Sequence, residues 1–405
     1  MKAWTSGAAV AALSLPSFAA LGAGAIVTVT HELDAARPDT VIAVPFAELA
    51  AVDPTLRMFH VVVRDPTGRA LPAQVTNYQH DHRGAQYDDL VFHYDFAAGE
   101  KRAAFSVEHV AKATPPEPPC AYARFVPERH DDMAWENDRI AHRMYGPALN
   151  SEAAGRERLR GSGIDIWAKR VAYPIIDRWY AKGHDQFHKD DEGEGYDVYS
   201  IGGSRGAGGT GVWVGTKLWT SDNFAKAEVL SNGPRRAAFR LHYAPFEAGA
   251  GMVSEIKQVT VDCGQNFTSI SSVFQLPGAE AVIGIGITDH PPAQGFPKSV
   301  LTRDPGGRWM SLWEENKDGA LGIAIILGAG ESAAGFAHEP PAKAPGNGNH
   351  LLLVKVKNGG PVRFLTGAAW SGSGQFADRA AWENQVRGQA DRASKPLAIA
   401  VSARP

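Results

Sequence analysis

Residues 235–276 read RRAAFRLHYAPFEAGAGMVSEIKQVTVDCGQNFTSISSVFQL, and this stretch determines the fold class. Its runs RRAAFRLHY (235–243), SEIKQVTVD (254–262) and FTSISSVFQL (267–276) alternate between apolar and polar residues, with Gly- and Asn-containing turns between them. Alternation with a period of two is typical of strands that bury one face. The stretch therefore predicts part of a large β-sandwich.

Similar runs continue on both sides of this stretch. Downstream lie AVIGIGITD (281–289), ALGIAIIL (320–327), HLLLVKVK (350–357) and PLAIAVSA (396–403), and residues 26–113 contain shorter alternating runs. The Pro-rich TPPEPP (114–119) cannot continue a strand ladder. We therefore expect a mostly β chain, with a smaller N-terminal β-sandwich region at 26–113, a linker at 114–119 and a larger β-sandwich at 120–405.

Composition narrows the class of protein without identifying an activity. The chain has 405 residues, and 41 Lys+Arg against 44 Asp+Glu give a formal net charge of −3. A near-neutral charge argues against nucleic-acid binding. Together 43 Gly and 26 Pro favour a protein rich in turns. The sequence shows no repeat period, which argues against a propeller.

The first 25 residues resemble a secretory signal peptide. Lys2 precedes the apolar, small-residue stretch AAVAALSLPSFAALGAGA (8–25), which is too short and Gly-rich to span a bilayer comfortably. We therefore expect a periplasmic or secreted protein without a membrane anchor. In such a compartment Cys120 and Cys263 either pair or remain buried thiols, and the sequence leaves both open.

Two short motifs suggest cofactors but fit them poorly. Residues 206–211 (GAGGTG) match the dinucleotide-binding pattern G-x-G-x-x-G, yet a strand-like run follows where a helix is required. These glycines fit a tight turn or a close backbone approach to a ligand. His184 and His188, with Asp190 and Asp191 beyond, have a spacing that suits a divalent metal on a helix, but Gly183 and DDEGEG (190–195) indicate a loop. We therefore expect no cofactor.

Charged and aromatic residues concentrate between 128 and 205. A run of charges is usually a solvated face, but here the charges alternate with Trp and Tyr, which are not typical of such a face. Aromatic faces beside Arg and Lys suit an acidic sugar, because a guanidinium can clamp a carboxylate with two hydrogen bonds. The substrate-binding candidates are Arg129, Trp135, Glu136, Asp138, Arg139, Trp167, Lys169, Arg170, Glu194, Tyr196 and Arg205.

Four segments of this region resemble the DUF4861 family of exported bacterial proteins. They are ERHDDMAWENDRIAHRMYGPAL (128–149), GIDIWAKR (163–170), YPIIDRWY (173–180) and GEGYDVYSIGGSRGAGG (193–209). The resemblance extends over roughly 26–405, although the segment from His188 to Glu194 has one residue more than the family spacing. It implies a large galactose-mutarotase-like β-supersandwich. It also implies a role in degrading uronate-containing polysaccharides, by an elimination such as that of a dehydratase or lyase.

Elimination beside a uronate carboxylate needs three groups. One neutralises the carboxylate, a base removes the adjacent proton, and an acid protonates the leaving oxygen. Chosen by residue type and motif, the neutralising candidates are Arg143, Arg139 and Arg205; the base candidates are His188 and then His130; the acid candidates are Tyr145 and then Tyr196. Glu136, Asp138 and Glu194 would orient these groups or bind hydroxyls.

Other classes of function remain open on the sequence. A glycoside hydrolase would use a carboxyl pair, such as Glu136 with Glu194 or Asp191. A non-catalytic glycan-binding protein would use the same aromatic and charged residues only to hold sugar, and a mutarotase would need a His and a carboxylate. The expected partner in every case is a carbohydrate, a uronate-containing oligosaccharide in the elimination hypothesis.

Overall fold

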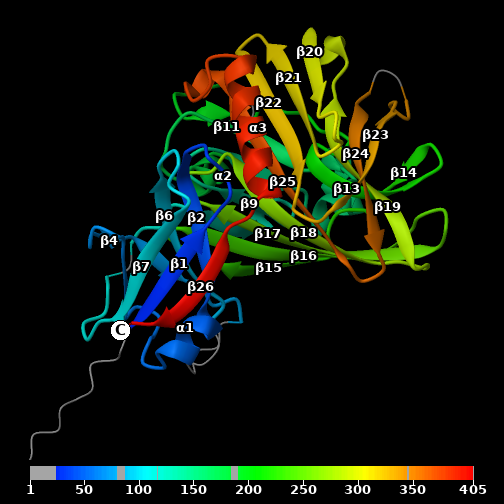
Figure 1. Ribbon diagram of the computed structural model, residues 1–405. Coiled ribbons are helices and arrows are strands. Elements are labelled where there is room, and N and C mark those ends of the chain that lie inside the picture. The colour runs from blue at the N-terminus through cyan, green and yellow to red at the C-terminus, as the bar shows by residue number, and fades with distance from the viewer. Residues whose placement is uncertain (1–23, 80–86, 116, 184–189, 344–345, 405) are drawn as a thin grey trace, which may run out of the picture.

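The computed structural model describes residues 24–79, 87–115, 117–183, 190–343 and 346–404. Within them the chain is mostly β, as the sequence predicts, and it is built from packed sheets rather than a barrel. A smaller sandwich contains the N-terminal strands, and a larger body contains an eight-stranded sheet and two further sheets (Figure 1). No helix in these residues has the length and apolarity needed to cross a membrane.

The smaller sandwich pairs a sheet of order β26-β1-β7-β3-β4 with one of order β2-β6-β5. Alternate residues of these strands are buried, which matches the period-two pattern of the sequence. Its elements are β1 (Ala25–Thr30), β2 (Arg37–Pro45), α1 (Phe46–Val52), β3 (Val61–Arg64), β4 (Ala70–Leu71), β5 (Ala73–Val75), β6 (Asp89–Phe96), β7 (Arg102–His109) and β26 (Ala398–Ala403).

The last strand changes the expected domain boundaries. β26 pairs antiparallel with β1 along its whole length, from Ala25 opposite Ala403 to Thr30 opposite Ala398. The N-terminal region is therefore not 26–113 alone, and the larger body does not extend to 405. A six-residue apolar strand does not specify in its own sequence which sheet edge it joins. Of the expected signal peptide at 1–25, residues 1–23 lie outside the described part of the chain.

The eight-stranded sheet forms the centre of the larger body. Its order is β15-β16-β17-β18-β25-β22-β21-β20, and every neighbouring pair is antiparallel. The stretch at 235–276 forms its β16–β18 core, as the sequence predicts. The strands are β15 (Lys226–Ser231), β16 (Arg236–Glu247), β17 (Met252–Asp262), β18 (Phe267–Gln275), β20 (Lys298–Arg303), β21 (Trp309–Asn316), β22 (Gly319–Leu327) and β25 (Pro361–Trp370).

Two smaller sheets complete the larger body. One has the order β14-β13-β19-β24-β23, and the other has the order β12-β11-β10-β9-β8. The strands of the first are β13 (Ala207–Val214), β14 (Lys217–Trp219), β19 (Glu280–Asp289), β23 (Ser332–Glu339) and β24 (Gly348–Lys357). The strands of the second are β8 (Tyr122–Val126), β9 (Asp132–Glu136), β10 (Ala141–Met144), β11 (Asp165–Lys169) and β12 (Gly195–Tyr196).

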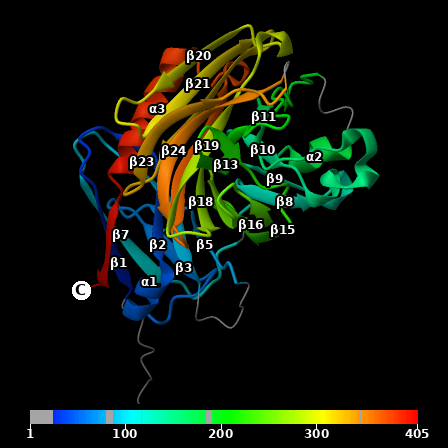
Figure 2. The same cartoon turned by 90° about the vertical axis from the view of Figure 1, so that its right-hand side faces the viewer.

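The helices lie on the outside of these sheets. α3 (Arg379–Ser394) covers the outer face of β21 and β22 (Figure 1), and its Trp382 ring stacks on Phe267 within an apolar cluster that includes Trp309. The remaining helical segments are α2 (Ile176–Ala181), η1 (Pro127–Arg129), η2 (Pro147–Asn150), η3 (Glu152–Glu157), η4 (Pro292–Gln294) and η5 (Ser371–Ser373). Figure 2 shows α2 with β8–β11 at the opposite side of the larger body from α3.

One hydrophobic core joins the three sheets of the larger body. It includes Phe239 and Ile270 of the eight-stranded sheet, Ile285 of β19, and Trp135 and Met144 of the β8–β12 sheet. Because side chains alternate along a strand, the β8–β12 sheet turns its other residues to the opposite face. On that face a second apolar cluster packs against α2. This second face holds the candidate site.

The glycine-rich motif at 206–211 starts strand β13 and is not followed by a helix. Gly206 has φ +62°, and a Cβ atom there would lie 2.0 Å from the Ile164 carbonyl oxygen. A Cβ atom on Gly208 would come within 3.0 Å of Thr366. The glycines therefore allow neighbouring strands to approach closely, and they do not form a dinucleotide-binding turn.

Candidate functional site

The ends of several strands bring one arginine and three aspartates together. Arg143 in β10 lies directly opposite Asp165 at the start of β11. Asp132 begins β9, and Asp197 follows β12. Because β10 runs antiparallel to β9 and β11, its C-terminal end lies beside their first residues. We call these four residues the Arg143 cluster.

The Arg143 guanidinium contacts all three carboxyl groups. Its Nη2 atom lies 2.6 Å from Asp165 Oδ2 and 3.1 Å from Asp197 Oδ2, and Nη1 lies 3.9 Å from Asp132 Oδ2. Arg143 is 2% exposed, and Asp132 and Asp165 are fully buried. A planar guanidinium can serve several carboxyl oxygens at once, which a lysine cannot match. The cluster is therefore a buried ionic centre with more acids than bases.

Burial and crowding change the proton affinity of this cluster. Burial raises the pKa of Asp165 well above its usual value, and the nearby Asp197 carboxylate raises it further, against the effect of Arg143. Burial also raises the pKa of Asp132, again opposed by Arg143. Asp165 and Asp132 therefore hold protons to a higher pH than exposed aspartates do, which is the property of a general acid.

Aromatic rings enclose the cluster. The Arg143 guanidinium lies 5.0 Å from the centre of the Tyr145 ring and 5.4 Å from that of Trp167. The Tyr180 hydroxyl donates a hydrogen bond to Asp132 Oδ2 at 3.3 Å. Burial, and then the Asp165 carboxyl, raise the pKa of Tyr145, so its hydroxyl keeps its proton. The predicted pair of Arg143 and Tyr145 thus lies in one site.

A second buried ion pair lies farther along the same face. Lys169 Nζ is 2.7 Å from Glu136 Oε2, and both residues are almost completely buried. Glu136 also accepts hydrogen bonds at 2.9 Å from the backbone N–H groups of Ile175 and Ile176 at the start of α2. The prediction that Glu136 and Lys169 bind substrate is wrong for this geometry, because these bonds occupy both side chains and anchor α2.

Charged and aromatic side chains on α2 and beside it form a group nearer the surface, in which Glu194 is buried. We call Arg170, Tyr173, Arg178, Asp191 and Glu194 the rim. Arg170 Nε lies 3.0 Å from Asp191 Oδ2, while Glu194 accepts hydrogen bonds from Tyr173 at 2.9 Å and from Arg178 at 2.8 Å. The Arg170 and Arg178 side chains remain 40% and 59% exposed, so they retain surface for a ligand.

Two tryptophan rings in contact connect the rim to the Arg143 cluster. Trp179 donates a hydrogen bond from Nε1 to Glu194 at 3.0 Å, and its ring lies 5.3 Å from that of Trp167. Trp167 in turn lies against Arg143. Trp167 is fully buried, so its ring packs against the cluster and has no exposed face for a sugar. This corrects its predicted role as a substrate-binding residue.

Arg129 and His130 lie near the cluster but face another partner. His130 Nε2 lies 3.3 Å from Glu157 Oε2, and Arg129 Nη1 lies 3.6 Å from the same oxygen. His130 follows η1 with a left-handed φ of +51°. Arg129 adds positive charge near Asp132 and lowers the pKa of that carboxyl, in opposition to burial. Arg129 thus affects the cluster through its charge.

Three further predicted residues have other environments. Trp135 is fully buried in the central core, where it stacks on His142 at 5.3 Å. Arg205 is 2% exposed and contacts Ser162 Oγ at 2.9 Å and the Gly203 carbonyl at 3.0 Å. For these two residues the predicted role in substrate contact is wrong. Tyr196 donates its hydroxyl proton to Asp318 at 2.7 Å.

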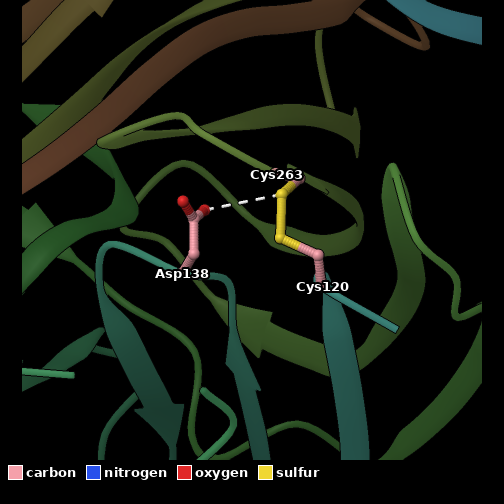
Figure 3. Close-up of side chains that lie close together, drawn as sticks. All are labelled: Cys120, Asp138 and Cys263. Carbon is pink, nitrogen blue, oxygen red and sulfur yellow. Dashed lines mark hydrogen bonds between the residues drawn. A yellow bond between two sulfur atoms is a disulfide. The ribbon is translucent and has the colours of Figure 1, made fainter. Parts of the chain in front are cut away.

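Asp138 and Arg139 lie beside a disulfide bond. Cys120 and Cys263 are bonded, which joins the start of the β8–β12 sheet to the end of β17. Asp138 accepts a hydrogen bond from the Gly264 N–H at 2.6 Å, and its Oδ1 atom lies 3.6 Å from the disulfide-bonded Cys263 Sγ (Figure 3). Arg139 Nε lies 3.6 Å from Asp138. Their predicted site role stays a prediction. The disulfide also removes both thiolates as metal ligands, although the three side chains lie close together.

The preferred base, His188, lies outside the described residues, as does His184 of the proposed metal motif. Their roles stay predictions. Asp191, which belonged to that motif, pairs with Arg170 and also accepts hydrogen bonds from the backbone N–H groups of Gly193 and Gly195. These contacts engage its carboxylate.

Sequence reasoning missed the three aspartates of the cluster. Asp165 lies within GIDIWAKR, Asp197 within GEGYDVYS and Asp132 within ERHDDMAW, all segments that had been singled out. The available signal was an aspartate within an otherwise apolar strand, since such a charge is buried only when it is paired. The pairing itself depends on the register of four strands, which no local pattern shows.

Comparison with known proteins gives a family and a distant structural likeness. Residues 29–399 match the family model DUF4861, a domain of unknown function. A protein of Formosa agariphila described as uncharacterized protein P7 is 34% identical over 287 residues, which cover 69% of each chain.

Two solved structures are similar to the chain at TM-scores below 0.5. One is an α-mannosidase from Enterococcus faecalis V583, with a TM-score of 0.48 and 10% identity over 94% of this chain and 46% of that one. The other is a glycosyl hydrolase family 38 protein from Enterococcus faecalis, with a TM-score of 0.46 and 9% identity over 95% of this chain and 48% of that one. The chain thus spans about half the length of each.

Proposed function

The chain belongs to the DUF4861 family, and we propose that it is an exported carbon–oxygen lyase or dehydratase that acts by elimination on uronate-containing oligosaccharides. The observation that carries the proposal is the Arg143 cluster beside Tyr145. It provides a carboxyl group with a raised pKa, a fixed cation and a protonated phenol within one aromatic-lined site. These are the groups that an elimination requires as acids and as electrostatic support.

The rim supports an acidic sugar as substrate. Arg170 stacks on Trp370 with 4.6 Å between the guanidinium and the ring centre, and Arg178 lies 5.5 Å from the centre of the Tyr173 ring. Guanidinium groups held over aromatic rings can bind a carboxylate. We propose that Arg170 and Arg178 neutralise the uronate carboxylate in place of Arg143, because their side chains are exposed whereas Arg143 is buried. Each would share its guanidinium with the acid that it already contacts, Asp191 or Glu194.

The chemical roles then follow from protonation states. Tyr145 is the proposed acid that protonates the leaving oxygen, because its raised pKa keeps the proton on its hydroxyl. Asp165 is the proposed proton reserve behind it. Arg143 is a positioning residue that holds Asp165 and Asp197 in place. We retain His188 as the proposed base, because a neutral imidazole accepts a proton near neutral pH.

Export is part of the proposal. A disulfide between Cys120 and Cys263 is typical of proteins that fold in an oxidising compartment. This supports a periplasmic or secreted protein, consistent with the signal-peptide pattern at 1–25. The substrate would then be a glycan or glycan fragment outside the cytoplasm.

A hydrolase is the second candidate, on a specific observation. Asp165 and Asp197 both contact the same nitrogen of Arg143, so they form a close carboxyl pair in which burial and repulsion raise one pKa. Such pairs serve as acid and nucleophile in glycosidases. This pair replaces the predicted combination of Glu136 with Glu194 or Asp191, since Glu136 is committed to Lys169 and α2.

The test is an ultraviolet assay on a panel of uronate oligosaccharides. Elimination produces a conjugated, unsaturated uronate that absorbs, whereas hydrolysis produces new reducing ends without that chromophore, and a binding protein produces neither. We expect Tyr145→Phe, Asp165→Asn and His188→Ala each to lower kcat by about 100-fold or more. Asp378→Asn, which retains the cap of α3, is the matched control. New reducing ends without absorbance would refute elimination.

A further inference from the structure

Three potential metal ligands meet at one end of the β14-β13-β19-β24-β23 sheet, away from the residues discussed so far. Asp289 ends β19, His338 lies one residue before the end of β23, and His350 is the third residue of β24. His338 and His350 are direct partners across the ladder, and His350 also lies opposite Ile287. Asp289 is two residues beyond Ile287, so all three side chains share one face of the sheet.

The ligand atoms point toward one another. His338 Nε2 lies 2.7 Å from Asp289 Oδ2, and His350 Nε2 lies 3.4 Å from Asp289 Oδ1. The two imidazole ring centres are 5.2 Å apart. One ligand atom from each residue can be chosen so that all three lie within 4.8 Å of each other. Each imidazole therefore faces a different oxygen of one carboxylate.

The surroundings leave one side of this group open. The His338 and Asp289 side chains are 44% and 32% exposed, whereas that of His350 is 14% exposed. The Nδ1 atom of His350 is buried and has no hydrogen-bond partner among the described residues. One largely buried ligand beside two more exposed ones is the arrangement of a site that an ion can enter from solvent.

Two imidazoles and one carboxylate are a ligand set that zinc uses. Zinc binds His nitrogen and carboxylate oxygen at about 2.0–2.2 Å, which places ligand atoms about 3–4 Å apart, so small side-chain rotations suffice here. Three protein ligands leave the fourth tetrahedral position for water or a substrate oxygen. We propose that Asp289, His338 and His350 form a mononuclear zinc site that joins the ends of β19, β23 and β24.

The proposal stands apart from the proposed function, because it uses none of the residues of the Arg143 cluster or the rim. It also differs from the motif of His184 and His188, which the sequence suggested. Without a metal, the same geometry is a pair of ordinary His–Asp contacts. Metal binding and simple ion pairing differ in stoichiometry, in ligand dependence and in spectroscopic signature, so an experiment can separate them.

The experiment uses the full chain without an affinity tag, stripped with a chelator and then titrated with zinc. We expect one zinc per chain by elemental analysis, and cobalt substitution should produce the visible absorption of a tetrahedral site. His338→Ala, on an exposed side chain, and His350→Gln should each weaken zinc binding by about 100-fold or more. His242→Ala is the control, because His242 forms a partly exposed contact with Glu228 without a second imidazole.

The outcomes decide the proposal in either direction. Loss of zinc in His338→Ala and His350→Gln, with retention in His242→Ala, supports the site. Absence of stoichiometric zinc uptake overturns it. Uptake that survives both substitutions but disappears in a His184→Ala/His188→Ala double variant also overturns it, since the metal would then lie elsewhere. None of these outcomes depends on whether the elimination assay succeeds.

Discussion

Replacing Arg143 with methionine tests the description of the Arg143 cluster. The substitution removes the cation but retains much of its volume, so Asp132, Asp165 and Asp197 remain buried without their shared partner. Removing one partner of a buried ion pair costs about 3–5 kcal/mol of stability, because the remaining charge is uncompensated. We therefore expect Arg143→Met to lower the free energy of unfolding by this amount at pH 8.

The deficit should shrink in acid. The pKa of Asp165 is raised in the folded state, so between the unfolded and folded pKa values the folded protein binds more protons than the unfolded chain. Over that range stability falls as pH rises. Without the guanidinium, which opposes the shift, the folded pKa rises further. The variant therefore loses most stability, relative to the native chain, above that pKa, and its deficit shrinks as the pH falls and Asp165 takes up its proton.

The assay is urea unfolding at pH 5 and pH 8, followed by tryptophan fluorescence. Arg205→Met is the matched control, because Arg205 is equally buried but has no carboxylate within ion-pair distance among the described residues. We expect the effect of that variant on stability to be the same at pH 5 and pH 8, because it leaves no carboxylate without its partner. The reasoning fails if Arg143→Met costs less than 1 kcal/mol at pH 8, or if its deficit is as large at pH 5.

Three further substitutions test other parts of the structure. Burial lowers the pKa of His142 to about 4, so its protonation in the unfolded chain should cost about 3 kcal/mol of stability between pH 7 and pH 4, and His142→Phe should remove this dependence in urea titrations. Cys120→Ser/Cys263→Ser opens a loop with a sequence separation of 143 and should lower the free energy of unfolding by about 2–5 kcal/mol; an unchanged urea midpoint would contradict this. Lys169→Met should cost about 3–5 kcal/mol in urea unfolding, and adding Glu136→Gln should recover part of that loss; additive effects would argue against a coupled pair.

Period-two patterns were enough to predict that the chain is mostly β. The runs at 235–276 became β16, β17 and β18, because alternation of buried and exposed residues requires little beyond a neighbouring strand. The place of β26 was not predictable in this way. Its alternating sequence fits any open edge, and only the folded chain shows that β1 accepts it.

The candidate site was predicted in part. Arg143 and Tyr145 were selected by residue type and do lie together, because they are two residues apart at the end of one strand. The roles of Glu136 and Lys169 were not predictable, since their pairing joins β9 to β11 and depends on α2. Charged residues in a motif thus identified the region, while register decided which of them are structural.

The central claim is that the protein acts by elimination. The most direct test is whether oxygen from water enters the products. The native chain is incubated with a uronate oligosaccharide in water labelled with heavy oxygen, and the products are analysed by mass spectrometry and ultraviolet absorbance. Elimination predicts unsaturated products that absorb and carry no label from the cleavage step. Saturated products that carry the label at a new reducing end would show hydrolysis and would contradict the account.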